Sequence, residues 1–322
     1  MTVHRLAADE TTVRVGVIDA AHPAVLSIDD GDEVVLETWS HWAGAVVPGT
    51  TLDEVLALRE QYPTGPHSMT GPIEIMGATQ GDVLRVEILE LVPGPWGFNL
   101  ALPAPLGRGV LAAQFPAGSL RHLALDRESM TTELLAGIDL PLTPFLGIMG
   151  VTPPNDGAHS SVPPGPFGGN LDLKDLVVGS SLFLPVFRPG AGFYCGDGHA
   201  AQGDGEVNQT AVETSMERAR LRFGVIDQYR QTGLAASPWA ETPTHLVTIG
   251  LDEDLDLAVH HAVRDLVTQL TGRFSLAADD AYTLASLMAD VEVTQAVNRV
   301  KGAHARLPWT AIGRTGPPAT PA

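Results

Sequence analysis

Hydrophobic and polar positions alternate along much of the first hundred residues, which is the pattern of β-strands with one buried face. The stretch "AVLSIDDGDEVVLETW" (24–39) reads as two strands around an Asp-Asp-Gly-Asp turn, and "GDVLRVEILELV" (81–92) reads as a half-buried strand. Between them, "TLDEVLALREQYP" (51–63) spaces its leucines and valine as a helix does. It predicts a short helix that is stopped by Pro63.

The remaining chain changes character towards its end. "SLFLPVF" (181–187) and "AGFYCGDGH" (191–199) are apolar enough to be buried strands, whereas "DLDLAVHHAVRDLVTQLTG" (254–272) carries a helical apolar stripe ending at Gly272. A second helix is expected in "SLAADDAYTLASLMAD" (275–290), with Ser275 as its N-cap. We therefore predict a mixed, β-rich α/β fold: a β-sandwich or barrel-like body with helices in the C-terminal third. One domain over residues 1–315 and a disordered tail over 316–322 are expected.

Charge and cysteine content narrow the functional classes. A net charge of −19 disfavours nucleic acid and anionic membranes as partners, and it is compatible with a small neutral molecule. The single cysteine, Cys195, allows no intrachain disulfide. The first residues lack the apolar run of a signal peptide, and no apolar run approaches the ~20 residues that span a bilayer. We expect a soluble cytoplasmic protein.

The segment "GDGHAAQGDGEV" (196–207) holds Asp197, His199, Asp204 and Glu206 within twelve residues. Asp197 and His199 are two apart, so in an extended backbone they share a face and can ligate one cation such as Zn²⁺. Asp204 and Glu206 repeat the spacing, and Glu206 can serve as base towards a water molecule. The alternative is a plain turn, because aspartate in Gly-Asp-Gly often bonds its own backbone.

Other candidates are weaker by pattern alone. In "GGNLDLKDL" (168–176), Asn170 and Asp172 alternate ahead of Lys174, so Asp172 is a possible third metal ligand; otherwise the segment is a polar turn before a strand. His41 stands beside Trp42, an arrangement more typical of packing than of catalysis. His67, ahead of "TGPI", lines a pocket or shapes a turn.

Two nucleophile hypotheses are disfavoured. Cys195 has no visible Cys-His-Asn or Glu-Lys-Cys arrangement, and a buried free cysteine is usually inert. Ser180 and Ser181, with Lys174 upstream, suggest a Ser-Ser-Lys amidase, but both serines open a strand and the usual glycine-rich frame is missing.

Three segments together resemble the acetamidase/formamidase family. They are "TGPIEIMGATQGDVLRVEIL", "GGNLDLKDLVVGSSLFLPV" and "GDGHAAQGDGEV" followed by "QTAVET", in the family's order. The likeness runs from about Ala24 to Leu307. It implies hydrolysis of a small carboxamide to carboxylate and ammonia, a β-rich α/β fold, a homo-oligomer (dimer or higher) and bound metal, zinc in particular.

The sequence departs from the family pattern at two places. Family members often read "GDGEVCGTA", whereas this chain has Asn208 in place of that cysteine, so a thiol there is not general to the activity. The "SHWAGAVVPG" stretch is also unexpected, and a bulky Trp42 can reshape the substrate pocket. A carbamate, a larger amide or a cyclic amide therefore stays open as substrate.

The sequence thus predicts a metal-dependent hydrolase of linear amides, with metal-activated water and a glutamate base. The expected metal is zinc, with calcium as the alternative. The expected residues are Asp197, His199 and Asp172 for the metal, Glu206, Asp204 and Lys174 for catalysis, and His67, Asn170 and Trp42 for the substrate. The alternatives are a metal-free amidohydrolase, a carbamate or larger-amide hydrolase with the same pocket, and a non-catalytic calcium-dependent binding protein. Which of His22, His41 and His67 joins the site stays open.

Overall fold

Two large β-sheets form the body of the molecule. The computed structural model describes residues 1–227 and 237–318. The first sheet has nine strands in the order β1-β5-β18-β7-β15-β19-β20-β22-β21. Their bounds, in that order, are Val3–Leu6, Glu33–Leu36, Met216–Ile226, Val83–Pro93, Ser181–Pro185, Trp239–Glu241, His245–Asp252, Lys301–Pro308 and Asp290–Gln295. Its long central pair, β7 and β18, is antiparallel.

The second sheet also has nine strands, with a branch at β6. Its main path runs β14-β12-β16-β17-β8-β9, and β6 pairs with β16, β2 and β4. The bounds along the path are Gly168–Asn170, Phe145–Gly150, Phe193–His199, Glu213–Thr214, Trp96–Ala101 and Ser119–Ala124; those of β6, β2 and β4 are Ser68–Ile75, Val13–Val15 and Leu26–Ile28. Two small pairs complete the strands: β10 with β11 (Thr131–Leu135, Ile138–Pro141) and β13 with β3 (Ala158–Ser160, Val17–Asp19).

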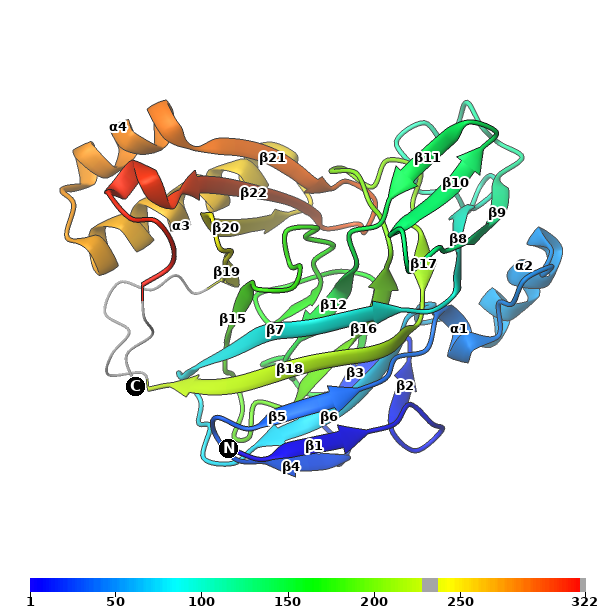
Figure 1. Ribbon diagram of the computed structural model, residues 1–322, viewed down its shortest axis with the longest axis horizontal. Helices are drawn as coiled ribbons and strands as arrows, with labels where there is room; N and C mark the ends of the chain where they lie inside the picture. Colours follow the sequence, from blue (N-terminus) through cyan, green and yellow to red (C-terminus); the bar gives the residue numbers. More distant parts are fainter. Residues whose placement is uncertain (228–236, 319–322) are drawn as a thin grey trace.

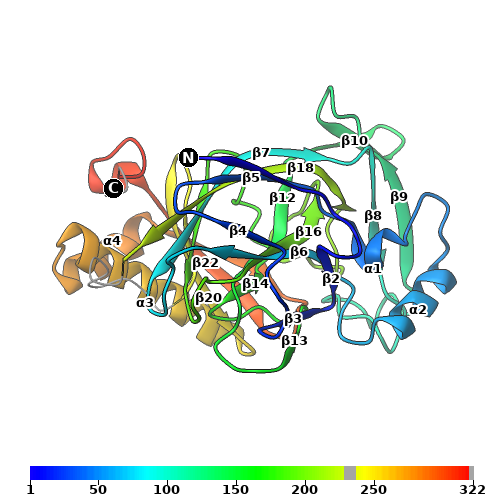
Figure 2. The ribbon, with the colours of Figure 1, turned by 90° about the horizontal axis from the view of Figure 1, so that it is seen from below.

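The main hydrophobic core lies between the two sheets. Figure 2 shows β5, β18 and β7 as one layer across β6, β16 and β12. Alternate side chains of the first sheet, such as Val86 and Leu221, enter the same buried cluster as Leu146 and Phe193 of the second. This is the arrangement of a β-sandwich, in which each strand directs every second side chain inwards.

Helices cover the two ends of the sandwich (Figure 1). At one end, α3 (Leu255–Phe274) and α4 (Ala278–Met288) pack on β20 and β22 around a second apolar cluster that includes Leu266 and Leu307, and η2 (Trp309–Ile312) closes it. At the other end, α2 (Leu52–Gln61) packs towards β8, together with the single turn α1 (His41–Gly44). A capping box between Thr51 and Glu54 starts α2.

One predicted cap is wrong. Ser275 does not start α4. It is the C-cap that directly follows α3, in a left-handed conformation with φ 58°, and α4 begins after Ala277 without a side-chain cap. The period of the apolar stripe continues beyond Gly272, so α3 runs two residues further than the glycine suggested. The aspartates in the first turn of α4, Asp279 and Asp280, give its amino end negative charge, which the helix dipole favours.

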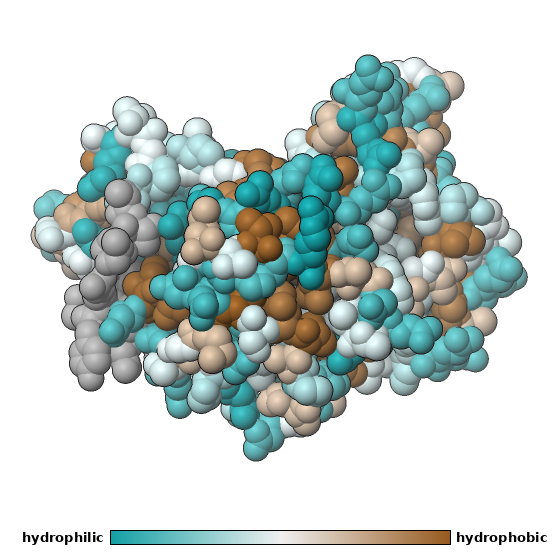
Figure 3. All heavy atoms as spheres, turned by 60° about the horizontal axis from the view of Figure 1, so that its bottom comes forward, coloured by the Kyte–Doolittle hydropathy of each residue, from teal (hydrophilic) through white to brown (hydrophobic). Residues whose placement is uncertain are grey.

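The predicted fold class is confirmed: the chain is β-rich, with its longest helices in the C-terminal part. The boundary of a single domain at 315 stays a prediction, and residues 319–322 of the expected tail lie outside the described residues. On the face shown in Figure 3, small hydrophobic groups are dispersed among hydrophilic residues, as on a water-exposed surface. No described helix has the length and apolar character needed to cross a membrane.

Close contact between α3 and β20 depends on Gly250. A Cβ at this position would lie 1.9 Å from the Ala258 carbonyl oxygen and 2.4 Å from the Ala262 nitrogen. Both are backbone atoms of the helix, so an alanine can be accommodated only if the helix moves away from the sheet.

We therefore expect Gly250→Ala to lower the free energy of unfolding by about 1–3 kcal/mol or more, the usual cost of overpacking. Gly224→Ala in β18 is the matched control, since its nearest neighbours would be 3.8 and 3.9 Å from the new Cβ. Urea unfolding of both variants measures the difference. Equal stability of the two would show that α3 is not held at this contact.

Candidate active site

The carboxyl end of β16 brings the first two predicted residues together. Asp197 and His199 are the fifth and seventh residues of this strand, so they lie in a sheet position and not in a flexible loop. Their side chains share a face, as the spacing predicted: His199 Nε2 is 3.4 Å from Asp197 Oδ2. Both are almost completely buried.

Neighbouring elements add Glu213, which the sequence analysis did not name, and His41, which it left open. Glu213, on β17 beside β16, places its Oε2 3.3 Å from Nε2 of both His199 and His41. His41, from α1, places Nε2 2.7 Å from Asp197 Oδ1. His41, one of the three histidines that the sequence left open, therefore contacts the site directly. Glu213 lies in the "QTAVET" segment that carried the family resemblance, and this was the available signal for it.

Three further residues complete the assembly. His67, just before β6, lies 4.0 Å from Asp197 through its Nε2. Asp172 and Glu206 come from loops, and their ligand atoms lie within 4.8 Å of each other and of His199. We call the full set the buried cluster: His41, His67, Asp172, Asp197, His199, Glu206 and Glu213. Each member is at most 7% exposed.

Hydrogen bonds made by Gln202 fix the orientation of the His199 ring. Gln202 donates from its Nε2 to the Asp172 carbonyl oxygen at 2.9 Å, which leaves its Oε1 facing His199 Nδ1 at 2.9 Å. His199 Nδ1 must therefore carry the proton in that hydrogen bond. Its Nε2 then points at Asp197 and Glu213. A neutral imidazole would present a lone pair to two carboxylates there, unless a proton or a cation lies between them.

Several buried atoms of the cluster have no hydrogen-bond partner. They are His199 Nε2, Asp172 Oδ1, Glu206 Oε2 and Glu213 Oε2, and they converge in overlapping groups that could each hold an ion. Buried polar atoms are normally satisfied, so such atoms indicate a missing partner. Imidazole nitrogen with carboxylate oxygen is a donor set that suits Zn²⁺. The residues present therefore fit a divalent metal.

Burial and mutual charge shift the pKa values of the cluster. Burial raises the pKa of Glu206 well above its ordinary value, and the neighbouring Asp172 adds to the effect; burial likewise raises the pKa of Asp172 to about 7. Burial acts the same way on Asp197, but His67 and His199 outweigh it and hold its pKa well below the ordinary value. Burial would lower the pKa of His199, yet Glu213 and Asp197 raise it well above normal. Asp197 is thus the ionised acid, whereas Glu206 and Asp172 favour the protonated form.

Backbone geometry keeps the cluster compact. Asp172, Asp197 and Glu206 all adopt left-handed backbone conformations, with φ of 50°, 56° and 47°. Such strain in non-glycine residues is typical of functional sites. Gly147 on β12 leaves the space that the acids occupy: a Cβ there would lie 2.7 Å from Asp172 Oδ1 and 2.8 Å from Asp197 Oδ2.

Two of the predicted catalytic residues lie in a different group. Lys174 and Asp204 form an ion pair at 2.5 Å, and Asp204 groups with Glu292 and the fully buried His304. Arg306 neutralises this second group through Glu292 at 2.9 Å.

The predicted substrate residues Asn170 and Trp42 are both buried. Asn170 donates to the Val162 carbonyl oxygen at 3.1 Å. The Trp42 ring meets His41 edge-on, with 5.4 Å between ring centroids, and it lines the cavity beside the cluster. His22, also considered from the sequence, is not among the grouped residues.

Asn208 is hydrogen-bonded to a neighbouring side chain, and Cys195 is packed in the hydrophobic core. Asn208, which stands where the family often has cysteine, donates to Asn99 Oδ1 at 2.7 Å. Cys195 faces the core between the sheets with no exposed surface, and burial raises the pKa of its thiol.

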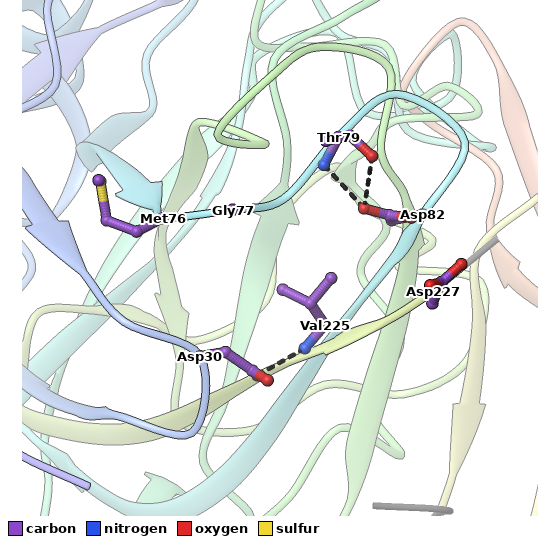
Figure 4. Close-up of a pocket in the computed structure, with 7 residues that line it drawn as sticks. All are labelled: Asp30, Met76, Gly77, Thr79, Asp82, Val225 and Asp227. Atoms are coloured by element: carbon purple, nitrogen blue, oxygen red, sulfur yellow. Dashed lines mark hydrogen bonds between the residues drawn. The ribbon is translucent and has the colours of Figure 1, made fainter.

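A second pocket, shown in Figure 4, has different chemistry. Asp30, Asp82 and Asp227 line it without any histidine. Asp82 Oδ2 accepts hydrogen bonds from the Thr79 backbone and hydroxyl at 2.7 and 2.9 Å, and Asp30 accepts one from the Val225 backbone at 2.8 Å. These two carboxylates stabilise turns, so we place the candidate active site at the buried cluster.

Comparison with known proteins decides the family. The model of the acetamidase/formamidase family matches residues 18–156 and 154–305. The chain belongs to this family. Among family relatives, it is 28% identical over 244 residues to an acetamidase of Mycolicibacterium smegmatis and 28% identical over 278 residues to a formamidase of Methylophilus methylotrophus. These matches cover 58% and 69% of this chain, and 59% and 67% of the relatives.

A solved structure extends the likeness over the whole chain. The crystal structure of an acetamidase from Bacillus halodurans superposes with a TM-score of 0.86 at 30% identity, covering 97% of this chain and 100% of that one. The sequence match to curated relatives is shorter: it spans 57% of a putative formamidase of Schizosaccharomyces pombe and 59% of the Mycolicibacterium smegmatis acetamidase. The shared fold therefore includes the sandwich and both helical ends.

The position of Cys195 leads to a prediction about its reactivity. Because the thiol is buried and its pKa is raised, it is protonated at pH 8 and inaccessible to reagents, and only the thiolate reacts quickly. We expect labelling by a thiol reagent to be at least about 100-fold slower in the native protein than in guanidinium. Rapid native labelling accompanied by loss of activity would instead support a nucleophilic cysteine.

Proposed function

We propose that this acetamidase/formamidase family member hydrolyses linear amides to a carboxylate and ammonia or an amine, with a divalent metal, first of all zinc, in the buried cluster. One observation carries the proposal: unpartnered imidazole and carboxylate atoms converge in a site closed to bulk water. Amides resist attack by water, so their hydrolysis needs both polarisation of the carbonyl and a base. The relatives' names support the same reaction.

We assign the metal to His199, Asp197 and Glu213, whose ligand atoms lie within 4.8 Å of one another. A divalent cation at this position would polarise the amide carbonyl and make water more acidic. Gln202 holds His199 in the tautomer with a free Nε2. Asp172, predicted as a ligand, is the alternative third donor, and Asn298 orients it by donating to its Oδ2 at 2.5 Å.

Glu206 is the proposed base. Its carboxylate accepts a proton from water as the water oxygen bonds to the carbonyl carbon. It then returns the proton to nitrogen as the C–N bond breaks, so that carboxylic acid and amine leave. A cation bound nearby would favour the ionised form of Glu206, whereas Asp172 favours the protonated form, and the two influences suit a group that gains and loses a proton.

Other predicted residues receive supporting roles. The ion pair between Lys174 and Asp204 is assigned the role of holding the loop that carries Glu206 in place. His67 and Trp42 line the cavity beside the cluster and are assigned to contact with the amide. Asn170 is assigned to holding the segment before Asp172. Localisation in the cytoplasm and assembly into a homo-oligomer stay predictions.

Calcium binding without catalysis is the less favoured alternative. Calcium prefers a shell of oxygen ligands, whereas three histidines border this cluster. Activity measured after metal removal distinguishes a metal-free hydrolase from the proposed metal-dependent one.

Chelation is expected to abolish ammonia release. The wild-type protein is assayed on formamide, acetamide, propionamide, a carbamate and an aryl amide, and we expect activity to fall at least about tenfold after chelation and to return with zinc. Full activity in protein shown to be metal-free would favour the metal-free alternative. If metal is bound and no linear amide, neutral or carboxylated, releases ammonia, the proposed reaction is wrong.

Replacing the base should separate catalysis from metal binding. Glu206→Gln keeps the side-chain shape but cannot accept a proton, so we expect kcat to fall about 100-fold or more while metal content is unchanged. Glu217→Gln, at a side chain 48% exposed on β18, is the control and should keep its activity within about twofold. An active Glu206→Gln enzyme would remove Glu206 from the role of base.

A further inference from the structure

A cavity of about 90 Å³ adjoins the buried cluster and carries unusual charge at its outer side. Its lining includes His41 and His67 of the cluster, together with Asn298, all of which are buried. Three arginines line it as well: Arg59, Arg108 and Arg299. Arg108 and Arg299 are exposed and Arg59 is half-buried, so the arginines mark the entrance.

The three arginines come from separate parts of the fold. Arg59 is on α2, Arg108 follows β8, and Arg299 lies in the turn between β21 and β22, with φ 68°. A larger hollow of about 430 Å³ shares Arg59, Arg299 and Trp42 with the cavity. The fold therefore concentrates positive charge at one opening from distant points in the sequence.

These arginines have no carboxylate partner within 4 Å in the part of the chain that the structure describes. Many other arginines of the same molecule have one: Arg222 binds Glu33 at 2.6 Å, and Arg306 binds Glu292 at 2.9 Å. Exposed ones such as Arg5 have none among the described residues. The chain has 38 acidic residues and only 19 basic ones, so partners are abundant. Guanidinium groups left unpaired in such a chain are available for a ligand.

We propose that the arginines form a subsite for a carboxylate, and that the substrate is a monoamide of a short aliphatic dicarboxylic acid; the identity of the reacting group rests on the proposed function. Guanidinium groups recognise carboxylates with paired hydrogen bonds. Within the buried cluster the ionised Asp197 repels the substrate's carboxylate, whereas the arginines at the entrance attract it. Both effects orient the amide inwards.

This inference replaces the neutral substrate that the overall charge suggested. A net charge of −19 describes the field far from the protein, which is screened over roughly 8 Å at physiological salt. At the entrance the nearest charges decide: the cavity is lined by three guanidinium groups, and the adjoining hollow adds one carboxylate, Glu60, so the local balance is positive.

The test compares amides matched in length with and without a terminal carboxylate: succinamate against butyramide, and glutaramate against valeramide. The variants are Arg59→Gln, Arg108→Gln and Arg299→Gln, with Arg5→Gln as control, since Arg5 is exposed on β1 at the edge of the other sheet. We expect wild-type kcat/KM to favour the carboxylated amide by at least about tenfold. Each cavity variant should reduce this preference about tenfold, mainly through KM, and Arg5→Gln should leave it unchanged.

Binding of succinate and glutarate, measured by calorimetry on the same folded proteins, needs no turnover. If neutral amides are hydrolysed but the carboxylated amides are not preferred and the ratio is unmoved by the variants, the subsite is refuted while the proposed function stands. If no amide is hydrolysed but succinate binds and loses about tenfold in affinity in the variants, the subsite stands and the proposed reaction fails. Absence of both binding and preference overturns the inference.

Discussion

The burial of four carboxyl groups and three imidazoles in one small volume is the constraint on which the rest of the structure depends. An isolated carboxylate taken out of water costs several kcal/mol, so such groups persist only where protons, hydrogen bonds or a cation offset the loss. The cost of burying Asp197 is offset by its hydrogen bond with His41 at 2.7 Å. Glu213 accepts a hydrogen bond from the Ala211 N–H at 2.9 Å. Asp172 and Glu206 retain unpartnered oxygens. A bound cation would supply the compensation that they lack.

The sandwich supplies the rigidity that this concentration of charge requires. His199 and Glu213 pair directly in the ladder between β16 and β17, and Asp197 lies two residues before His199 on the same strand, so the ladder restrains their backbone positions. Asp172 and Glu206 come from loops, but hydrogen bonds from Asn298 and Gln202 tie the Asp172 loop to the site. The strands that carry the cluster belong to the second sheet; the first sheet contributes Asn298 from the turn between β21 and β22, and α1 contributes His41 directly.

The spacing of apolar residues predicted the individual strands and helices that bury one face along their length. The strand β7 and the helix α3 follow from periodicity, because each buries one face along its whole length. The pair Asp197 and His199 was found for the same reason, since spacing within one strand decides which face a side chain takes. Glu213 and Asn298 reach the site only through strand pairing and loop packing, which single-sequence periodicity does not contain. His41 was left open because its neighbour Trp42 suggested packing, and the structure has both: the tryptophan packs while the imidazole bonds to Asp197.

The charge distribution separates the two ends of the path that a substrate would follow. At the inner end, burial raises the pKa of both Asp172 and Glu206, and Asp172 raises the pKa of Glu206 further. This arrangement suits a bound cation and the transfer of a proton between groups. The entrance has unpaired guanidinium groups and the Trp42 ring. A neutral amide would gain nothing from the arginines, and a dicarboxylate would keep their attraction at the entrance but gain less at the inner end than an uncharged amide. A ligand with an uncharged amide at one end and a negative charge at the other satisfies both ends at once, and the arrangement therefore selects by polarity as well as by size.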